Sequence, residues 1–199
     1  MTEDGFEYTF QVNHLAQMYL TLLLSPLLNT GSRVISISSE SHRFSSLNGE
    51  LTTESLCPTA ASNYSLMSAY NNSKLLNLWM VQALHQRWFE SRGIAVNGVH
   101  PGNMVMTEIT RHSWLVWLLF LLVRPFTKSL QQAAATSVFA AASPDTTGLS
   151  GCYFNNCFPT LPSKAVQNLN LTEQAWKLSM KMLIHATQGT TPPIPKEFL

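Results

Sequence analysis

Two short apolar runs, each preceded by a helical stretch, constrain the fold of this chain most strongly. Arg33–Ser39 and Ile94–Val99 are rich in valine and isoleucine, and each run is short. This pattern predicts buried strands. Helical patterns over residues 6–29 and 67–91 precede them, and a third short strand is expected at Gly151–Asn155. Strands that alternate with helices predict an α/β fold, in which helices cover a parallel sheet.

Two further helices and a tail complete the predicted organisation. An alanine-rich helix is expected at residues 129–142, and a last helix at residues 172–187, with Thr172 as its N-cap. The chain has 199 residues and 45% hydrophobic content, which suits one globular domain. We assign residues 1–188 to this domain. Residues 189–199 are rich in proline and are predicted to form a flexible tail.

Composition excludes several classes of protein. The net charge is +1 and no basic cluster occurs, so we expect no nucleic-acid partner. The three cysteines, Cys57, Cys152 and Cys157, lack zinc-ligand spacing, and we expect free thiols and no metal site. The acidic start, residues 1–5, does not resemble a secretory signal. We therefore expect a cytoplasmic location, with a membrane-associated or mitochondrial one as alternatives.

A tyrosine and a lysine four residues apart, Tyr70 and Lys74, are the strongest candidates for chemistry. Four residues are about one helical turn, so both side chains share a face of the predicted helix. An ammonium group beside a phenol favours the phenolate, which makes the phenol useful for proton transfer. The spacing alone is a weak signal, because it arises often by chance on helices, where the lysine is simply solvated.

Two strand ends strengthen this interpretation. Ser39 closes the first predicted strand, and Pro101 and Gly102 follow the second. The carboxyl ends of parallel strands meet at one edge of the sheet, where ligands bind. The helix that carries Tyr70 and Lys74 follows the first strand, so the sequence predicts a proton-transfer site at this edge. The alternative for Ser39 is a plain strand-end hydroxyl.

These segments resemble the short-chain dehydrogenase/reductase family. The resemblance runs from about Gly5 to Ala186 and is carried by Phe10-Gln11-Val12-Asn13-His14-Leu15, Ile37-Ser38-Ser39, Tyr70-x-x-x-Lys74 and His100-Pro101-Gly102. It implies a Rossmann-like, doubly wound parallel sheet. It also implies an NAD(P)-dependent oxidoreductase that interconverts an alcohol and a carbonyl. The family's glycine-rich turn, Gly-x-x-x-Gly-x-Gly, does not occur here, so we expect the first βαβ units to be absent.

The resemblance assigns roles to individual residues. Tyr70 is the general acid/base, Lys74 holds the nicotinamide ribose, Ser39 bonds the reacting oxygen, and Asn13 holds a water that relays protons; Pro101, Gly102 and, more weakly, Thr107 line the cofactor. The family's threonine position is occupied by Met106, one residue before Thr107. The choice between NAD and NADP is made in the part that is absent.

Within the family, later stretches resemble the retinol dehydrogenase branch. They are Ser39–Phe44, His100–Met104, Arg124–Ser129 and Tyr153–Cys157. The apolar run Trp114–Val123 matches the family's substrate-binding segment, which implies a lipophilic substrate. It is shorter than the roughly 20 apolar residues that span a bilayer, and we favour a lid or core helix over a membrane-surface contact. The helix over residues 67–91 often forms a homodimer face in this family.

Two other functions stay open at this stage. Loss of the phosphate-binding part would make the chain a catalytically inactive interaction module. It would also leave Arg33–Ser39 as an apolar sheet edge that is prone to aggregation. An epimerase or dehydratase would use the same tyrosine and lysine, but the later stretches favour the retinol dehydrogenase pattern. Joint retention of Asn13, Ser39, Tyr70 and Lys74 favours catalysis.

Overall fold

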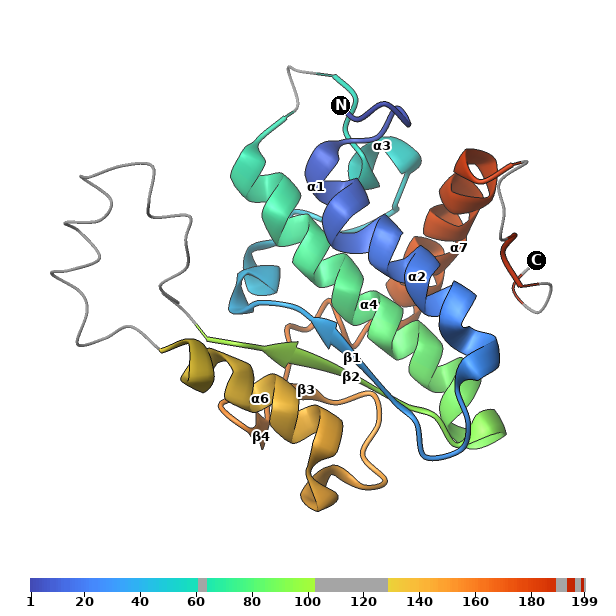
Figure 1. Cartoon of the computed structure of the whole chain (residues 1–199). Coiled ribbons are helices and arrows are strands. Elements are labelled where there is room, and N and C mark those ends of the chain that lie inside the picture. Colours follow the sequence, from blue (N-terminus) through green and yellow to red (C-terminus); the bar gives the residue numbers. More distant parts are fainter. Residues whose placement is uncertain (61–63, 103–128, 189–192, 196–197, 199) are drawn as a thin grey trace, which may run out of the picture.

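The structure is a computed structural model that describes residues 1–60, 64–102, 129–188, 193–195 and 198 (Figure 1). Its helices and strands are α1 (Tyr8–Phe10), a π-helical segment (Gln11–Leu15), α2 (Ala16–Leu24), β1 (Arg33–Ile37), α3 (Thr53–Leu56), α4 (Leu66–Arg92), β2 (Ala95–His100), α6 (Leu130–Ala142), β3 (Tyr153–Asn155), β4 (Phe158–Pro159) and α7 (Leu169–Ala186). Single 3₁₀ turns lie at Ser25–Leu27, Glu40–Phe44 and Pro144–Thr146.

The strands form one sheet in the order β1-β2-β3-β4. β1 pairs with β2, and β2 with β3, in parallel, whereas β4 pairs antiparallel with β3. The register aligns Ile37 with Val99, and His100 with Asn155. The parallel strands confirm the α/β class, and β1 lies at an edge of the sheet.

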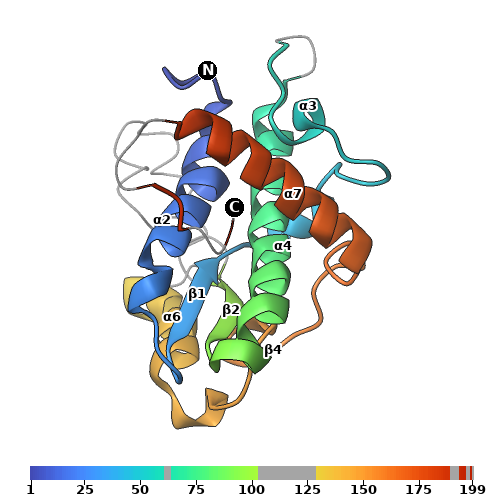
Figure 2. The ribbon, with the colours of Figure 1, turned by 90° about the vertical axis from the view of Figure 1, so that its right-hand side faces the viewer.

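Helices cover both faces of this sheet, as the two views of the ribbon show (Figures 1 and 2). α4 packs on one face, where α1, the π-helical segment and α7 contact it, and the apolar cluster there includes Trp79, Val96 and Tyr153. α6 packs on the other face, where Ala140 meets Val99 and Phe154. The expected doubly wound arrangement is therefore confirmed for this part of a Rossmann-like fold.

The central helix α4 is buried along most of its length. It begins at Ser65, whose side chain accepts a hydrogen bond from Ser68 N, and it ends at Gly93, whose left-handed φ of +65° favours glycine. Its buried residues include Lys74 and Asn77 as well as apolar side chains, because α1, the π-helical segment and α7 also pack against it. A Cβ atom at Gly98 of β2 would overlap the Leu78 side chain, so this glycine allows the close approach of α4 to the sheet.

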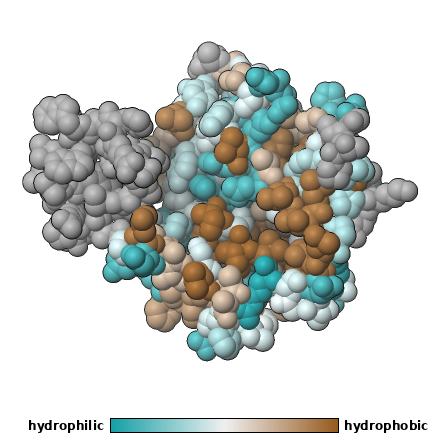
Figure 3. Space-filling view, in the orientation of Figure 1, coloured by the Kyte–Doolittle hydropathy of each residue, from teal (hydrophilic) through white to brown (hydrophobic). Residues whose placement is uncertain are grey.

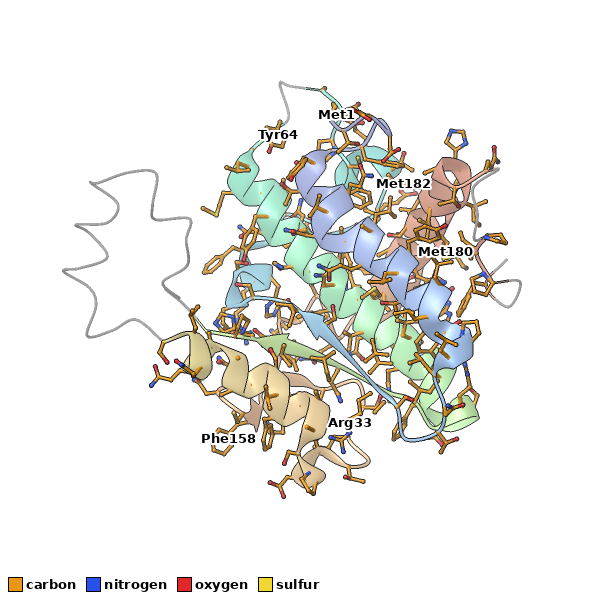
Figure 4. All side chains as sticks on the ribbon, viewed as in Figure 1. Met1, Arg33, Tyr64, Phe158, Met180 and Met182 are labelled. Carbon is orange, nitrogen blue, oxygen red and sulfur yellow. The ribbon has the colours of Figure 1, made fainter. Side chains whose placement is uncertain are left out.

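Arg33 fastens the start of β1 to the end of α6 (Figure 4). Its guanidinium donates to the backbone oxygens of Ala141 and Ser143 at 3.2 and 2.8 Å, and to the Thr146 hydroxyl at 2.9 Å. Cations stabilise the carbonyl end of a helix. This contact sets the position of β1 against the second helical layer.

Three local predictions need correction. The helix expected over residues 6–29 is divided, with a π-helical turn in its first half and a 3₁₀ turn at its end. α7 begins at Leu169 because the Asn168 side chain accepts from two backbone N–H groups, so the prediction that Thr172 is the N-cap is wrong. The short strand β4 was not expected, since its two residues include a proline.

Only part of the tail is described. Ile194 is buried, and the Phe198 ring lies 5.9 Å from that of Trp88 on α4. A flexible tail over residues 189–199 stays a prediction. None of the helices within the described ranges is both long and apolar enough to cross a membrane. The run Trp114–Val123 lies outside the described residues.

Candidate active site

The first two strands deliver their following residues to one edge of the sheet. Ile37 pairs with Val99, and the Ser38 N–H donates to the Val99 oxygen at 2.8 Å. Ser39 and Pro101 therefore leave the sheet at the same level. The structure thus brings together the two strand ends that the sequence singles out.

Lys74 reaches this edge from α4. Its ammonium nitrogen donates to the backbone oxygen of Ile37 at 3.3 Å and lies 5.5 Å from the centre of the Tyr70 ring. Lys74 is only 8% exposed, whereas Tyr70 is 38% exposed. Burial lowers the pKa of Lys74 by desolvation. The cation is therefore held inside the edge, and the tyrosine faces outward where a ligand can reach it.

The two serines that follow β1, Ser38 and Ser39, have different hydrogen-bond partners. Ser38 is buried, and its hydroxyl donates to the backbone oxygen of Lys74 at 2.8 Å, which ties the strand end to α4. Ser39 is half-buried, and its side-chain oxygen accepts from Ser41 N at 3.2 Å at the start of the 3₁₀ turn. A hydroxyl that accepts one bond still has its own proton to donate. Ser39 can therefore still donate to a substrate oxygen.

A buried histidine, His42, holds the segment that follows Ser39. Its Nδ1 lies 2.6 Å from the Ser39 carbonyl oxygen, and its Nε2 accepts from Ser163 N at 3.0 Å. A carbonyl only accepts and a backbone N–H only donates, so the proton sits on Nδ1 and the ring is neutral. Burial lowers the pKa of His42. Sequence reasoning did not single out this role.

The residues around His42 extend this support to the far strands. The Tyr153 hydroxyl donates to Glu40 at 2.8 Å, and its ring meets that of His42 edge-on at 5.1 Å. Arg43 donates to the same carboxylate at 2.7 Å. Glu40 and Tyr153 both fall within stretches that resemble the retinol dehydrogenase branch. That resemblance is the one sequence feature that pointed to both residues.

Asn13 lies in the π-helical segment and faces α4. Its amide donates to the Ser73 hydroxyl at 3.1 Å, and that hydroxyl donates to the Tyr70 backbone oxygen at 2.8 Å. Single π turns inside helices occur often at functional sites. Asn13 is thus linked to the turn of α4 that carries Tyr70 and Lys74.

Of the remaining predicted residues, Pro101 and Gly102 lie within the described part of the chain. Gly102, two residues after the end of β2, has φ of +117°, a conformation that favours glycine. Met106 and Thr107 lie outside the described residues, as does most of the stretch Arg124–Ser129. Within the ranges that the structure describes, no group of three His, Cys, Asp or Glu side chains is placed to hold a metal.

The donors at this edge fit the ribose side of a nicotinamide cofactor. The Lys74 ammonium has three protons, so its bond to Ile37 leaves others for sugar hydroxyls. The Tyr70 phenol is accessible. The glycine-rich phosphate turn of the family is absent from the sequence, so the chain provides residues for one end of such a cofactor only.

Comparisons with known proteins show what this chain is similar to. No protein-family model matches the chain. WW domain-containing oxidoreductase from Drosophila melanogaster is 52% identical over 183 residues, which are 92% of this chain and 44% of that protein. The human protein of the same name is 47% identical over 188 residues, 92% of this chain and 45% of that protein. Retinol dehydrogenase 12 from Mus musculus is 38% identical over 189 residues, 92% and 56% respectively.

One solved structure shares the fold. A crystal structure of an uncharacterised protein from Mycobacterium paratuberculosis matches with a TM-score of 0.67 at 24% identity, covering 98% of this chain and 63% of the other. The chain spans about half the length of the oxidoreductases and retinol dehydrogenases that it matches. The resemblance to the retinol dehydrogenase branch is confirmed for a part of those proteins, and the WW domain-containing oxidoreductases match an equal share of this chain.

Proposed function

We propose that this chain, similar over 92% of its length to part of a short-chain dehydrogenase/reductase, carries the catalytic residues of an NAD(P)-dependent oxidoreductase. The reaction would interconvert an alcohol and a carbonyl. One observation carries the proposal: the buried Lys74 ammonium lies 5.5 Å from the Tyr70 ring, at the strand end that Ser39 follows.

The chain's own residues would handle the proton. In reduction Tyr70 gives its phenolic proton to the carbonyl oxygen, and in oxidation it takes the proton of the alcohol. Lys74, whose ammonium lies 5.5 Å from the centre of the Tyr70 ring, would hold the nicotinamide ribose beside it. The Ser39 hydroxyl donates to the reacting oxygen and orients it. Asn13 supports a relay of protons toward Lys74. When bound, NAD or NADP supplies or accepts the hydride.

A lipophilic substrate is the second part of the proposal. Retinol dehydrogenase 12 is among the relatives, and its name specifies an apolar alcohol. The run Trp114–Val123 provides apolar side chains after Pro101 and Gly102 in sequence. A membrane-surface contact through this run, and a homodimer through α4, stay predictions. The middle of α4, residues 71–81, is buried within the single chain, so a second copy would have to meet the ends of this helix.

Cofactor binding tests the proposal directly. NADH and NADPH would be titrated against the folded chain, with nicotinamide fluorescence as the signal. We expect Lys74→Ala to weaken binding by about tenfold or more, the loss of one charge-assisted hydrogen bond. Lys177→Ala, which removes a 73% exposed lysine side chain of α7, is the control and should bind like the unaltered chain.

Turnover separates catalysis from binding. Apolar and polar carbonyl compounds would be reduced with the preferred cofactor, and Tyr70→Phe should abolish turnover without a comparable loss of binding. Preference for polar compounds would contradict the lipophilic substrate. A folded chain that binds neither cofactor would contradict the enzyme proposal for this chain.

If the folded chain binds neither cofactor, we propose instead that it is a catalytically inactive interaction module. The open edge at β1, which can pair with another chain, favours it.

A further inference from the structure

A line of buried polar groups runs from α7 to the active-site edge. The Ser179 hydroxyl lies 2.9 Å from Nε2 of His14, and Nδ1 of His14 lies 3.4 Å from Oδ1 of Asn77. The amide of Asn77 donates to the Ile37 backbone oxygen at 3.0 Å. Lys74 donates to that same oxygen. Ser179, His14 and Asn77 are each no more than 2% exposed.

The donors and acceptors in this line have one consistent arrangement. Asn77 donates from its nitrogen to Ile37, so its oxygen faces His14. His14 must therefore carry its proton on Nδ1, and its Nε2 accepts from the Ser179 hydroxyl. Burial lowers the pKa of His14 to about 4, so the ring is neutral near pH 7. Every group is thus fixed by its neighbour.

The line of polar groups ends at the backbone oxygen of Ile37, which accepts from two side chains. In the parallel pairing of β1 with β2, Ser32 O and Ser38 N bond β2, so the alternating residues Arg33, Ile35 and Ile37 direct their backbone groups to the open edge. Among the described residues the Ile37 oxygen therefore has no strand partner, and two side chains of α4 bond it instead. Asn77 and Lys74 are three residues apart and share a helix face.

We infer that Asn77 and His14 are positioning residues that hold the Ile37 carbonyl, and through it the Lys74 ammonium, in the orientation that the active site needs. Both residues are buried, so neither is accessible to substrate or cofactor. Asn77 fixes the direction of the carbonyl, and His14 fixes the side-chain amide of Asn77. The catalytic relevance of this arrangement rests on the proposed function, but the arrangement itself does not.

The test follows the mobility of the Lys74 ammonium directly. The chain has six lysines, Lys74, Lys128, Lys164, Lys177, Lys181 and Lys196, so the ¹⁵Nζ signals can be separated, and Lys74→Arg assigns the one of interest. We expect Asn77→Leu to speed hydrogen exchange of the Lys74 ammonium protons several-fold and to broaden its signal. A residue with a purely structural role would not change this signal.

A matched control lies on the same helix. Asn72 is also a buried asparagine of α4, but its amide oxygen accepts from Ser45 and Ser46 instead. Asn72→Leu should destabilise the chain and leave the Lys74 signal unchanged. If Asn77→Leu does not fold, His14→Phe and Ser179→Ala interrupt the line of polar groups further from Lys74 and take its place in the test. His14→Gln can still donate to Asn77, so the Lys74 signal of this variant should match that of the unaltered chain.

The outcomes separate the two proposals. Faster exchange in Asn77→Leu and His14→Phe, but not in Asn72→Leu, supports the positioning role even if no variant binds cofactor. Unchanged exchange in Asn77→Leu and His14→Phe, or an equal effect in Asn72→Leu, overturns it even if the chain is an active enzyme. Where the unaltered chain binds NADH or NADPH, Asn77→Leu should weaken binding about as much as Lys74→Ala.

Discussion

The amide of Asn13 donates to the hydroxyl of Ser73 across 3.1 Å, and so joins two motifs that lie 60 residues apart. Asn13 belongs to the π-helical segment before α2, and Ser73 is the residue before Lys74 on α4. Ser73 in turn donates to the Tyr70 backbone. The contact shows that the asparagine, tyrosine and lysine motifs form one physical unit.

Removing the hydrogen bond between Asn13 and Ser73 should lower the stability of the folded chain. Asn13→Ala should lower the free energy of unfolding by about 1 kcal/mol, as expected for one hydrogen bond. Urea unfolding measures this change. In a chain that already carries Ser73→Ala, the further change Asn13→Ala should cost little, because the partner is gone. Equal costs in both backgrounds would show that the hydrogen bond is not the cause.

The neutral His14 should make stability fall in acid. Its pKa is lowered from 6.5 to about 4, because burial disfavours the charged ring. Between these values the unfolded chain binds a proton that the folded chain does not. Stability should therefore fall as the pH drops from about 6.5 to about 4, by roughly 3 kcal/mol in total.

Urea unfolding at a series of pH values checks this slope. His14→Gln should reduce it, because no imidazole remains at this buried position, whereas His42, whose pKa burial also lowers, keeps its own contribution. His185→Gln changes an exposed residue at the end of α7 and should follow the unaltered chain. The explanation fails if His14→Gln keeps the full slope.

His42 should matter more than its neighbours in the same turn. His42→Leu leaves the Ser39 oxygen and the Ser163 N–H without the ring nitrogens that bond them, which should cost about 2–4 kcal/mol. Phe44 is 77% exposed, and Phe44→Leu should change stability little. Thermal unfolding of both variants compares them, and similar losses would contradict a specific role for His42.

The sequence predicted the elements whose signals are local. The strand expected at Arg33–Ser39 is β1, Arg33–Ile37, and the helix expected at residues 67–91 is α4, Leu66–Arg92. Short β-branched runs and capped helices depend mainly on neighbouring residues. The π turn at Gln11–Leu15 was not predictable, because Asn13 and His14 meet their partners on α4 only after folding. β4 is too short to leave a pattern.

In the candidate site, too, the residues with local sequence signals were predicted and those with distant partners were not. Strand ends and one helical turn were enough to place Ser39, Tyr70 and Lys74 at one edge. His14 and His42 were missed as supporting residues, since a single histidine in a sequence gives no sign of its partners. Their partners, such as Ser179 and Ser163, come from segments more than 100 residues away.

Gly98 and Leu78 should behave as a coupled pair. A Cβ atom at Gly98 would overlap the Leu78 side chain, so Gly98→Ala should destabilise the chain by about 1–3 kcal/mol. Leu78→Ala alone leaves a cavity. The double variant should cost less than the sum, because the new methyl group occupies part of the space that leucine leaves. Additive costs in urea unfolding would contradict this packing.

The last prediction concerns the open edge of the sheet. α2, β1 and α6 lie at the front of the molecule in the view of Figure 1. These elements and the π-helical segment carry exposed apolar side chains, namely Val12, Leu20, Leu24, Ile37, Leu130 and Val138. Figure 3 shows apolar residues gathered across the middle of this face. An apolar sheet edge favours pairing with another chain, so the isolated chain should associate with itself as its concentration rises.

Charges on this face should oppose that association. Leu20→Lys with Val138→Lys places two cations on α2 and α6 and should shift sedimentation toward the single chain. Phe158→Lys, on β4 at the opposite edge, replaces an apolar residue that is at least as exposed as Leu20 and Val138, and is the control. If the open edge at β1 drives association, only the first variant should reduce it. An equal reduction by Phe158→Lys would mean that net charge, and not this edge, controls association.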